Sequence, residues 1–380
     1  MTRLGLLTNE FQPIAGGIGT YAMEVARAAQ AQGHEVTLLA PAFGRQNGEQ
    51  DRQLPFRVLR YPGRGAALRD YAALLPAALA FARRNDIDVL HACDSSSLAA
   101  LSVTQPLHRR QFLATIHGSD VKRAGAGVYR QVARLAGFYT RPERILANSQ
   151  YTRSVLLDNC PGVDPARVIV TPLGVASAWF EPAGDAACLR ELGVQSEQRL
   201  IVCVARITAR KGQIAAVQAF GKLPEDLRRG SRLLLIGAAN PSDARYEAEL
   251  QRVVRAGAPG VILAGKLAMR DVRAIYAKAR LFVLPGGTDG PWVEGFGLVF
   301  LEAAAQGLPA VAGRHGGVAE AVVHERTGLL VEPGDVAALA LAMQRLLGDD
   351  ELCRDLGQQA RARARTFTWE RCAAQTYAAL

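Results

Sequence analysis

Short apolar runs of strand length alternate with longer, helix-length stretches along the whole chain of 380 residues. This alternation is typical of β-α units whose strands form parallel sheets. The sequence therefore predicts an α/β fold. In the first half the expected strands are Leu4–Thr8, Val36–Ala40, Phe56–Arg60, Val89–Ala92, Phe112–Ile116, Ile145–Asn148 and Val168–Thr171. In the second half they are Leu200–Val204, Leu233–Ile236, Val261–Ala264, Leu281–Leu284, Ala310–Ala312 and Leu329–Val331.

A stretch rich in Pro and Gly, PLGVASAWFEP from Pro172 to Pro182, interrupts the alternation and keeps no period of its own. The chain is also too long for one typical domain. We therefore expect two doubly wound domains, residues 1–175 and 176–364. Ligands of such sheets bind beyond the carboxyl ends of the strands. This rule places four loops at a cleft between the domains, those after Thr8, Ile116, Val204 and Leu284.

Composition and termini favour a cytoplasmic protein. The longest apolar run, Ala72 to Ala82, has eleven residues with Pro76 among them, too few to span a bilayer. The amino terminus, MTRLGLLTNE, enters a strand directly and lacks a signal-peptide pattern. Six cysteines without a C-x-x-C pair indicate neither a disulfide framework nor a zinc site.

The formal net charge of +10 is unevenly distributed. Between positions 52 and 84 a single acid, Asp70, stands among the arginines 52, 57, 60, 64, 69, 83 and 84. Such a surface attracts anionic lipid headgroups or a phosphorylated acceptor. Nucleic acid is disfavoured, because the arginines are not interleaved with aromatic residues and aromatic content is only 6%. The alternative is a solvated surface in an arginine-rich protein.

Residues 281–307, LFVLPGGTDGPWVEGFGLVFLEAAAQG, carry the clearest indication of function. A strand enters a Pro/Gly-rich loop, which leads through Glu294 and Gly295-Phe296-Gly297 into a helix with Glu302. Bare amides at a helix N-terminus bind an anion, whereas the Glu294 carboxylate suits sugar hydroxyls. Glu302 follows about two helical turns later, within reach of a ribose. The stretch predicts a nucleotide-sugar site; the alternative is an ordinary strand-loop-helix unit with solvated glutamates.

The Glu-x7-Glu spacing in VEGFGLVFLEAAAQGLP resembles the signature of the retaining family-4 glycosyltransferases of GT-B fold. The resemblance extends over essentially the whole chain. It implies two Rossmann-like doubly wound domains facing each other across a cleft, the first holding the acceptor and the second the donor. The final segment from Phe367, FTWERCAAQTYAAL, resembles the GT-B terminal helix that crosses back, at about residues 365–380, onto the first domain.

Two cations follow the strand that opens the second half, Arg206 and Lys211 in VARITARKGQ. A departing sugar diphosphate gains negative charge, which a guanidinium and an ammonium can neutralise. The Arg-x4-Lys spacing matches the family's diphosphate clamp. Carboxylates that bind a metal would be expected just after a strand that faces the cleft, and no acidic cluster stands there. Asp86 and Asp88 are close together, but they precede their strand. We therefore expect neither a metal nor another cofactor. Arg210 lies between the two cations in the sequence, and we expect it to face solvent.

Two segments of the first half resemble other family motifs. His117, in ATIHGSD, matches the His of a His-Gly-x-Asp segment that contacts the donor sugar, while Asp120 alternatively caps the next helix. Gly16 and Gly17 match a Gly-Gly pair whose backbone approaches the diphosphate or the acceptor. Their spacing is not the G-x-G-x-x-G of dinucleotide-binding proteins.

The resemblance assigns the site as follows. The catalytic residues are His117, Arg206, Lys211 and Glu294. The donor-binding residues are Gly16, Gly17, Arg206, Lys211, Glu294, Phe296, Gly297, Leu298 and Glu302. The nucleobase lies near Gly237, Lys266 and Leu267. The family retains the configuration of the sugar, and no carboxylate in these motifs is an obvious covalent nucleophile.

The loop GGTDGPWVEGFG resembles that of the bacterial GDP-mannose-dependent mannosyltransferases of the phosphatidylinositol mannoside type. This favours mannose transfer from GDP-mannose to an unidentified acceptor, lipid-linked or anionic, by an enzyme peripheral on the inner face of the membrane. A UDP-sugar-dependent glucosyl- or N-acetylglucosaminyltransferase stays open. A nucleotide-sugar epimerase or hydrolase, a nicotinamide oxidoreductase and a non-catalytic binding protein fit the motifs less well.

Overall fold

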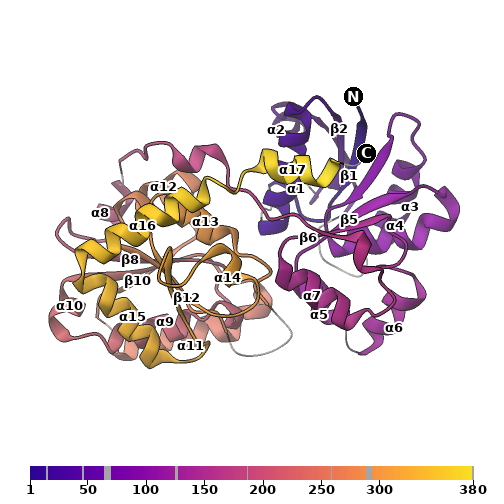
Figure 1. Cartoon of the computed structure of the whole chain (residues 1–380). Helices are drawn as coiled ribbons and strands as arrows, with labels where there is room; N and C mark the ends of the chain where they lie inside the picture. Colours follow the sequence, from indigo (N-terminus) through magenta and orange to yellow (C-terminus); the bar gives the residue numbers. More distant parts are fainter. Residues whose placement is uncertain are drawn as a thin grey trace. The chain divides into compact units, whose positions relative to one another are not determined.

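A computed structural model describes residues 1–13, 16–44, 47–63, 70–124, 127–185, 187–257, 259–287 and 293–378. The chain divides into two compact units (Figure 1). The first comprises Met1–Gly174 together with Thr368–Leu380, and the second comprises Val175–Phe367. Each unit is built around its own parallel sheet.

The sheet of the first unit has seven strands in the order β3-β2-β1-β4-β5-β6-β7. Their bounds are β1 Arg3–Leu7, β2 Glu35–Pro41, β3 Arg57–Tyr61, β4 Val89–Ala92, β5 Phe112–Ile116, β6 Arg144–Ala147 and β7 Val168–Val170. The helices are α1 Gly17–Ala31, α2 Gly48–Arg52, α3 Asp70–Ala82, α4 Ser95–His108, α5 Ser119–Ala124, α6 Gly127–Leu135, α7 Gln150–Asn159 and α17 Trp369–Tyr377, with the 3-10 turn η1 Pro165–Arg167. The strand order reverses between β1 and β4, so ligands are expected at the loops that follow these two strands.

The sheet of the second unit has six strands in the order β10-β9-β8-β11-β12-β13, and its order reverses between β8 and β11. The strands are β8 Arg199–Val204, β9 Ser231–Ile236, β10 Val261–Gly265, β11 Leu281–Leu284, β12 Ala310–Gly313 and β13 Gly328–Val331. The helices are α8 Ala187–Glu191, α9 Gln213–Gly221, α10 Glu225–Arg229, α11 Ala244–Gly257, α12 Met269–Lys278, α13 Leu298–Ala305, α14 Val318–Ala321, α15 Val336–Gly348 and α16 Asp350–Ala364, with the 3-10 turns η2 Ser177–Phe180, η3 Ala209–Lys211 and η4 Pro241–Asp243.

Each expected strand forms within two residues of its predicted bounds. Central strands such as β5 (FLATI) and β11 (LFVL) are buried along their whole length. Continuous burial is the mark of a parallel sheet whose two faces are both covered by helices. The prediction of two Rossmann-like, doubly wound sheets is therefore confirmed.

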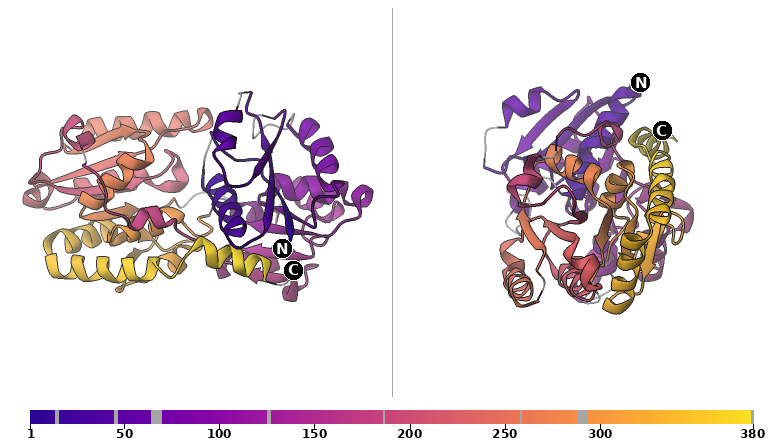
Figure 2. Two further views of the ribbon diagram at one scale, coloured as in Figure 1. Left: turned by 90° about the horizontal axis from the view of Figure 1, so that it is seen from above. Right: turned by 90° about the vertical axis from the view of Figure 1, so that its left-hand side faces the viewer.

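The helix α17 belongs to the first unit although the chain reaches it only after the whole second unit. It packs against α1 (Figures 1 and 2), and the Gln32 side-chain amide donates to the Glu370 carbonyl oxygen at 2.7 Å. At Gly174 a Cβ would lie 2.3 Å from the backbone nitrogen of Trp369. Only glycine allows the two segments to come so close.

Throughout the described ranges, every helix is either too short or too polar to cross a bilayer.

Candidate active site

The predicted cations of the second unit lie where the order of its sheet reverses. Lys211 ends η3, which follows β8, and Glu294 follows β11, the neighbouring strand. The two loops touch through their backbones, because a Cβ at Gly212 would lie 2.3 Å from the Gly286 carbonyl oxygen. The Gly287 N–H also donates to the Arg210 carbonyl oxygen at 2.9 Å. This approach brings the Lys211 ammonium into an ion pair with the Glu294 carboxylate.

Glu294 is fixed from its other side by the turn after β12. The Gly317 N–H donates to the Glu294 carbonyl oxygen at 2.8 Å, and a Cβ at Gly316 would clash with the same oxygen at 2.2 Å. Burial by itself would raise the pKa of the Glu294 carboxyl, but the adjacent Lys211 ammonium more than offsets it. The net pKa is below the ordinary value, so Glu294 is a carboxylate at neutral pH and is ready to accept hydroxyl hydrogen bonds.

Two further residues contribute to this site. Arg210, which was expected to face solvent, is half-buried and lies close enough to Glu294 to help lower its pKa, so that expectation is wrong. His315, which sequence reasoning missed, is also a charge neighbour of Glu294, and its Nδ1–H donates to the Gly313 carbonyl oxygen at 3.1 Å. The sequence does contain an indication for His315, because this residue follows a predicted strand of the same sheet and ligand-binding loops follow the carboxyl ends of such strands.

Arg206 follows the same strand as Lys211 and its side chain is exposed. Its carbonyl oxygen accepts a hydrogen bond of 2.8 Å from the Gln213 side-chain amide at the start of α9. Both predicted cations thus belong to the loop between β8 and α9. Among the residues that the structure describes, no group of three or more His, Cys, Asp or Glu side chains gathers as a metal site.

The helix α13 carries the second glutamate. Its N-cap, Gly297, has φ +92°, a conformation that glycine adopts without strain. Phe296 beside it is buried, with its ring 5.6 Å from that of Phe367, so the start of the helix is anchored in the core. Leu298 begins the helix, and Glu302 lies a turn further on. Burial raises the pKa of the Glu302 carboxyl to about 7, and unlike Glu294 it has no cation among its electrostatic neighbours in the described chain.

The predicted nucleobase region lies at the carboxyl ends of β9 and β10, on the same edge of the sheet. The Gly237 N–H donates to the Gly265 carbonyl oxygen at 2.8 Å. A Cβ at Gly237 would lie 1.9 Å from the Ala205 carbonyl oxygen, so this glycine lets three strand ends meet. Lys266 is exposed and Leu267 half-buried just beyond β10. The structure therefore gathers every predicted donor residue of the second half on one edge.

In the first unit, His117 follows β5 in a defined tautomer. Its Nε2 lies 2.9 Å from the Cys93 carbonyl oxygen. A carbonyl only accepts, so Nε2 carries a proton, and in the neutral imidazole Nδ1 is the nitrogen that can accept a hydrogen bond, for example from a sugar hydroxyl. The ring also meets the Tyr21 ring edge to face, with centroids 5.1 Å apart. Asp120 accepts the backbone N–H of His117 at 3.2 Å and of Val121 at 3.0 Å, so its carboxylate organises the turn into α5.

A buried chain of hydrogen bonds connects α17 to the neighbourhood of His117. The Tyr377 hydroxyl lies 2.9 Å from Nδ1 of His91, and Nε2 of His91 lies 2.8 Å from the Thr115 hydroxyl. The Thr115 hydroxyl lies 2.7 Å from that of Tyr21, whose ring contacts His117. Burial, and secondarily the neighbouring His117, lowers the pKa of His91 to about 3. His91 is therefore neutral and acts as a hydrogen-bonding link.

The predicted Gly-Gly loop holds a carboxylate of the chain itself. Gly16 is the N-cap of α1, and a Cβ there would lie 2.1 Å from Oε1 of Glu10. The same oxygen accepts the Gly19 N–H at 3.3 Å. An anion is thus already present at the N-terminus of α1, where Gly16 and Gly17 were expected to approach a diphosphate or an acceptor. Glu10 was not singled out from the sequence.

The arginine-rich stretch is not a uniform basic face. Arg60 pairs with Asp51 through two hydrogen bonds, of 2.9 and 2.6 Å, and Arg84 pairs with Asp86. Both acids lie just outside residues 52–84, so the charges within that stretch alone do not reveal these ion pairs. Arg64 and Arg69 lie outside the described residues.

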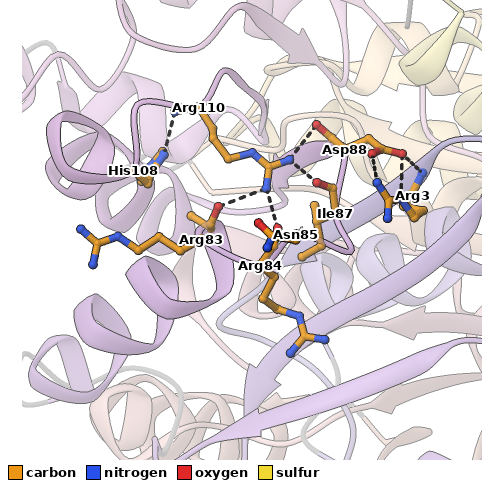
Figure 3. A pocket seen from close by; sticks show the side chains of 9 residues that line it. Arg3, Arg83, Arg84, Asn85, Ile87, Asp88, His108 and Arg110 are labelled. Carbon is orange, nitrogen blue, oxygen red and sulfur yellow. Dashed lines mark hydrogen bonds and ion pairs between the residues drawn. The ribbon is translucent and has the colours of Figure 1, made fainter.

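A hollow of about 510 Å³ adjoins this stretch, lined by Arg3, Arg83, Arg84, Asp88, His108 and Arg110 among others (Figure 3). It lies at the amino ends of β1, β4 and β5, on the edge of the sheet opposite to His117. The Arg110 guanidinium donates to the carbonyl oxygens of Ala82 at 3.1 Å and Asp88 at 2.9 Å, and Asp88 pairs with Arg3. These cations stabilise the end of α3 and the turn after it, so the hollow has a structural explanation.

The chain is similar to known proteins over almost its whole length. Residues 15–179 match the model of "Glycosyltransferase Family 4" and residues 188–363 match that of "Glycosyl transferases group 1". A GDP-mannose-dependent α-(1-6)-phosphatidylinositol monomannoside mannosyltransferase of Mycobacterium tuberculosis is 32% identical over 95% of this chain and 93% of its own. A GDP-mannose-dependent monoacylated α-(1-6)-phosphatidylinositol monomannoside mannosyltransferase of Corynebacterium glutamicum is 29% identical over 96% of this chain and 94% of its own. HepE of Anabaena, solved with UDP-glucose, has a TM-score of 0.82 at 20% identity, covering 99% of this chain and 98% of that one.

Fold and sequence together define a glycosyltransferase of the GT-B class. The chain belongs to the family-4 glycosyltransferases, and within them to the type of the phosphatidylinositol mannoside mannosyltransferases. A nucleotide-sugar epimerase or hydrolase is accordingly not favoured.

Proposed function

We propose that this chain is a retaining mannosyltransferase that moves mannose from GDP-mannose to an inositol phospholipid or its mannosylated derivative. The observation that carries the proposal is similarity over almost the full length to enzymes of that donor and acceptor. The ion pair of Lys211 and Glu294, held where the sheet order reverses, supports it chemically.

In the proposed site, the donor diphosphate lies against Lys211, Arg206 and the backbone amides of Phe296 to Leu298. Charge grows on the diphosphate as its bond to the sugar breaks, so fixed cations and helix amides stabilise the transition state more than the ground state. Glu294 accepts mannose hydroxyls, and Glu302 accepts ribose hydroxyls. Before the donor binds, Lys211 keeps Glu294 ionised.

The proposed transfer needs no covalent intermediate. The acceptor hydroxyl forms a bond to the anomeric carbon on the face from which the phosphate leaves, while the bond from that carbon to the phosphate oxygen breaks. Because the new bond forms on the same face from which the phosphate leaves, the configuration of the anomeric carbon is retained. The hydroxyl proton passes to the departing phosphate oxygen, so charge balances. Nε2 of His117 is held by the Cys93 carbonyl oxygen. Nδ1 accepts a hydrogen bond from a mannose hydroxyl and so fixes the sugar ring during this step.

The decisive experiment combines donor binding with turnover. Thermal denaturation with GDP, GDP-mannose, UDP and UDP-glucose identifies the donor, because a ligand of the folded state stabilises it by mass action. Release of nucleoside diphosphate is then measured with plain vesicles and with vesicles that contain phosphatidylinositol or its monomannoside. We expect stabilisation by the guanosine ligands and release of GDP that depends on the lipid. Stabilisation by UDP ligands alone would overturn the donor, and release that ignores the lipid would overturn the acceptor.

A further inference from the structure

Thr208 directs its hydroxyl away from the turn that it begins. This residue precedes η3, the 3-10 turn that ends in Lys211, and the Lys211 N–H donates to the Thr208 carbonyl oxygen at 2.9 Å. A threonine in this place commonly caps its turn by accepting a backbone N–H with the side-chain oxygen. Within the described turn the Thr208 side chain makes no such cap. Its hydroxyl instead donates to Oδ1 of Asp243 at 2.7 Å, although the two residues are 35 positions apart.

Asp243 belongs to the loop that follows the neighbouring strand of the sheet. β9 ends at Ile236, and the loop continues through Gly237 to η4, whose last residue is Asp243. The Asp243 N–H donates to the Asn240 carbonyl oxygen at 2.8 Å, so the carboxylate projects from a fixed turn. Thr208 is 8% exposed, so its hydroxyl is largely shielded from water. A hydrogen bond to a carboxylate in such a place is stronger than one between neutral groups.

The backbones around this hydrogen bond are tied together as well. The Ile207 N–H donates to the Ala238 carbonyl oxygen at 3.0 Å. At the start of α9, the Ile214 N–H donates to the hydroxyl of Tyr246, a residue of α11, at 3.1 Å. The loop between β8 and α9 is thus tied on both sides of its lysine to the chain that follows β9. The side-chain hydrogen bond lies between these two ties, at the start of the turn that carries the lysine.

We propose that Asp243 is a positioning residue of this enzyme, which acts through the Thr208 hydroxyl to hold the Lys211 ammonium where the donor diphosphate binds. The inference rests on the proposed function, in which the diphosphate lies against Lys211. A lysine carries its charge on a flexible four-carbon stem, so the place of that charge depends on a fixed main chain beneath it. In a reacting site, a displacement of about 1 Å costs about 100-fold in rate.

The ion pair with Glu294 does not replace this support. In the proposed site the diphosphate would compete for the Lys211 ammonium, so the hold of Glu294 on the lysine would weaken when the donor binds. The main chain of η3 would keep the lysine in place in both states. Because Asp243 comes from the loop that begins at Gly237, the same hydrogen bond would also connect the diphosphate clamp to the predicted nucleobase region.

Binding of GDP, measured by titration calorimetry on the full chain, tests the proposal, and release of GDP from GDP-mannose is a second readout. T208V keeps the shape of the side chain and removes the hydroxyl, whereas T208S keeps the hydroxyl and is the matched control. T208V should bind GDP about five- to tenfold more weakly and lower kcat by a similar factor, because the turn loses a hydrogen bond to a charged group. T208S should behave as the parent does.

Two double-mutant cycles separate positioning from a general loss of stability. D243A removes the same hydrogen bond from its other end, so T208V should cost nothing further in GDP affinity when it is added to D243A. Lys211→Ala removes the group that the hydrogen bond positions, so T208V should cost nothing further in that background either. A merely structural role would give T208V the same cost with and without the lysine. Melting temperatures show that each variant folds.

GDP affinity and kcat like those of the parent in T208V would overturn the proposal, as would an equal loss in T208S. A cost of T208V that persists in full in the Lys211→Ala background would overturn it too. If the parent binds UDP and not GDP, the proposed donor fails, and the same cycles read with UDP still decide the role of Asp243. If the parent binds neither nucleotide, the proposed function and this inference fail together.

Discussion

Lys211 and Glu294 are the residues whose chemistry depends most on each other. Each side chain is less than one-fifth exposed, and the ammonium and the carboxylate form an ion pair. In the proposed site, the donor would therefore meet a charged pair rather than two free groups. Its diphosphate would compete for the ammonium, while its sugar hydroxyls would replace the hydrogen bond that the carboxylate loses.

We expect Lys211→Ala to lower kcat as well as kcat/KM with GDP-mannose, because the ammonium acts most where diphosphate charge develops. A loss of about 2–4 kcal/mol of transition-state stabilisation is expected, by analogy with the loss of one oxyanion donor. Steady-state kinetics measure it, and Lys222→Ala, which removes an exposed lysine after α9, is the control. A folded Lys211→Ala enzyme with a normal kcat would show that this lysine is not part of the clamp.

In the proposed site, Glu302 would make donor binding depend on pH. Its folded-state pKa is about 7 against an ordinary 4.5, so the folded protein holds the proton more tightly than the unfolded chain does. Stability therefore falls as pH rises from about 4.5 through 7, by on the order of 1–3 kcal/mol in total. Glu302→Gln removes this penalty, so the ligand-free variant should melt above the parent at pH 8 and alongside it near pH 5.

The same Glu302→Gln substitution should weaken donor binding, because an amide accepts ribose hydroxyls less strongly than a carboxylate does. Thermal scans at the two pH values, with and without GDP, measure both effects. Glu351→Gln, an exposed position on α16, serves as the matched control and should change neither. An equal offset of Glu302→Gln at pH 5 and pH 8 would contradict the burial of an unpaired carboxyl.

At the scale of elements, α17 contributes side chains that the first unit needs. Tyr377→Phe removes the hydroxyl that satisfies Nδ1 of buried His91. Leaving that nitrogen unsatisfied should destabilise the protein by about 1–3 kcal/mol. The measurement is chemical denaturation in a double-mutant cycle with His91→Leu. Tyr377→Phe should cost much less in the His91→Leu background, and an identical cost in both would exclude the hydrogen-bonded chain as the cause.

For the molecule as a whole, we expect turnover to survive chelation. The charge of the leaving diphosphate is assigned to Arg206, Lys211 and the N-terminus of α13, all parts of the chain itself. GDP release should therefore continue in excess EDTA at a rate within about twofold of the untreated enzyme. Activity that disappears with EDTA and returns with magnesium or manganese would assign that charge to a metal ion instead.

The strands and the two sheets were predictable from the sequence because apolar runs of strand length report burial directly. The strand-end rule likewise placed His117, Arg206, Lys211 and Glu294 on the ligand-binding edges of their own sheets. Pairings were not predictable in this way. Lys211 meets Glu294 because Gly212 and Gly286 let two loops touch, a matter of backbone geometry.

Other features depended on partners distant in the sequence or just outside the window considered. Glu10 reaches the start of α1 from the preceding loop. Asp51, which pairs with Arg60, lies one residue before the arginine-rich stretch 52–84. The exposed apolar residues of α6, Val128 and Leu135 among them, have ordinary helical periodicity, and only the fold shows that they face away from the core. Part of the loop GGTDGPWVEGFG, residues 288–292, lies outside the described residues, so its resemblance stays a prediction.

The membership of α17 in the first unit has a consequence for biosynthesis. The ribosome synthesises residues 1–174 long before it makes α17, the helix that contacts His91 and Tyr21. The second unit, Val175–Phe367, is translated in between. The nascent first unit must wait with that apolar surface uncovered, a situation in which chaperones bind growing chains. For the same reason a gene fragment that stops at residue 174 would encode an incomplete domain. A fusion that appends residues 368–380 through a short linker would restore its missing helix.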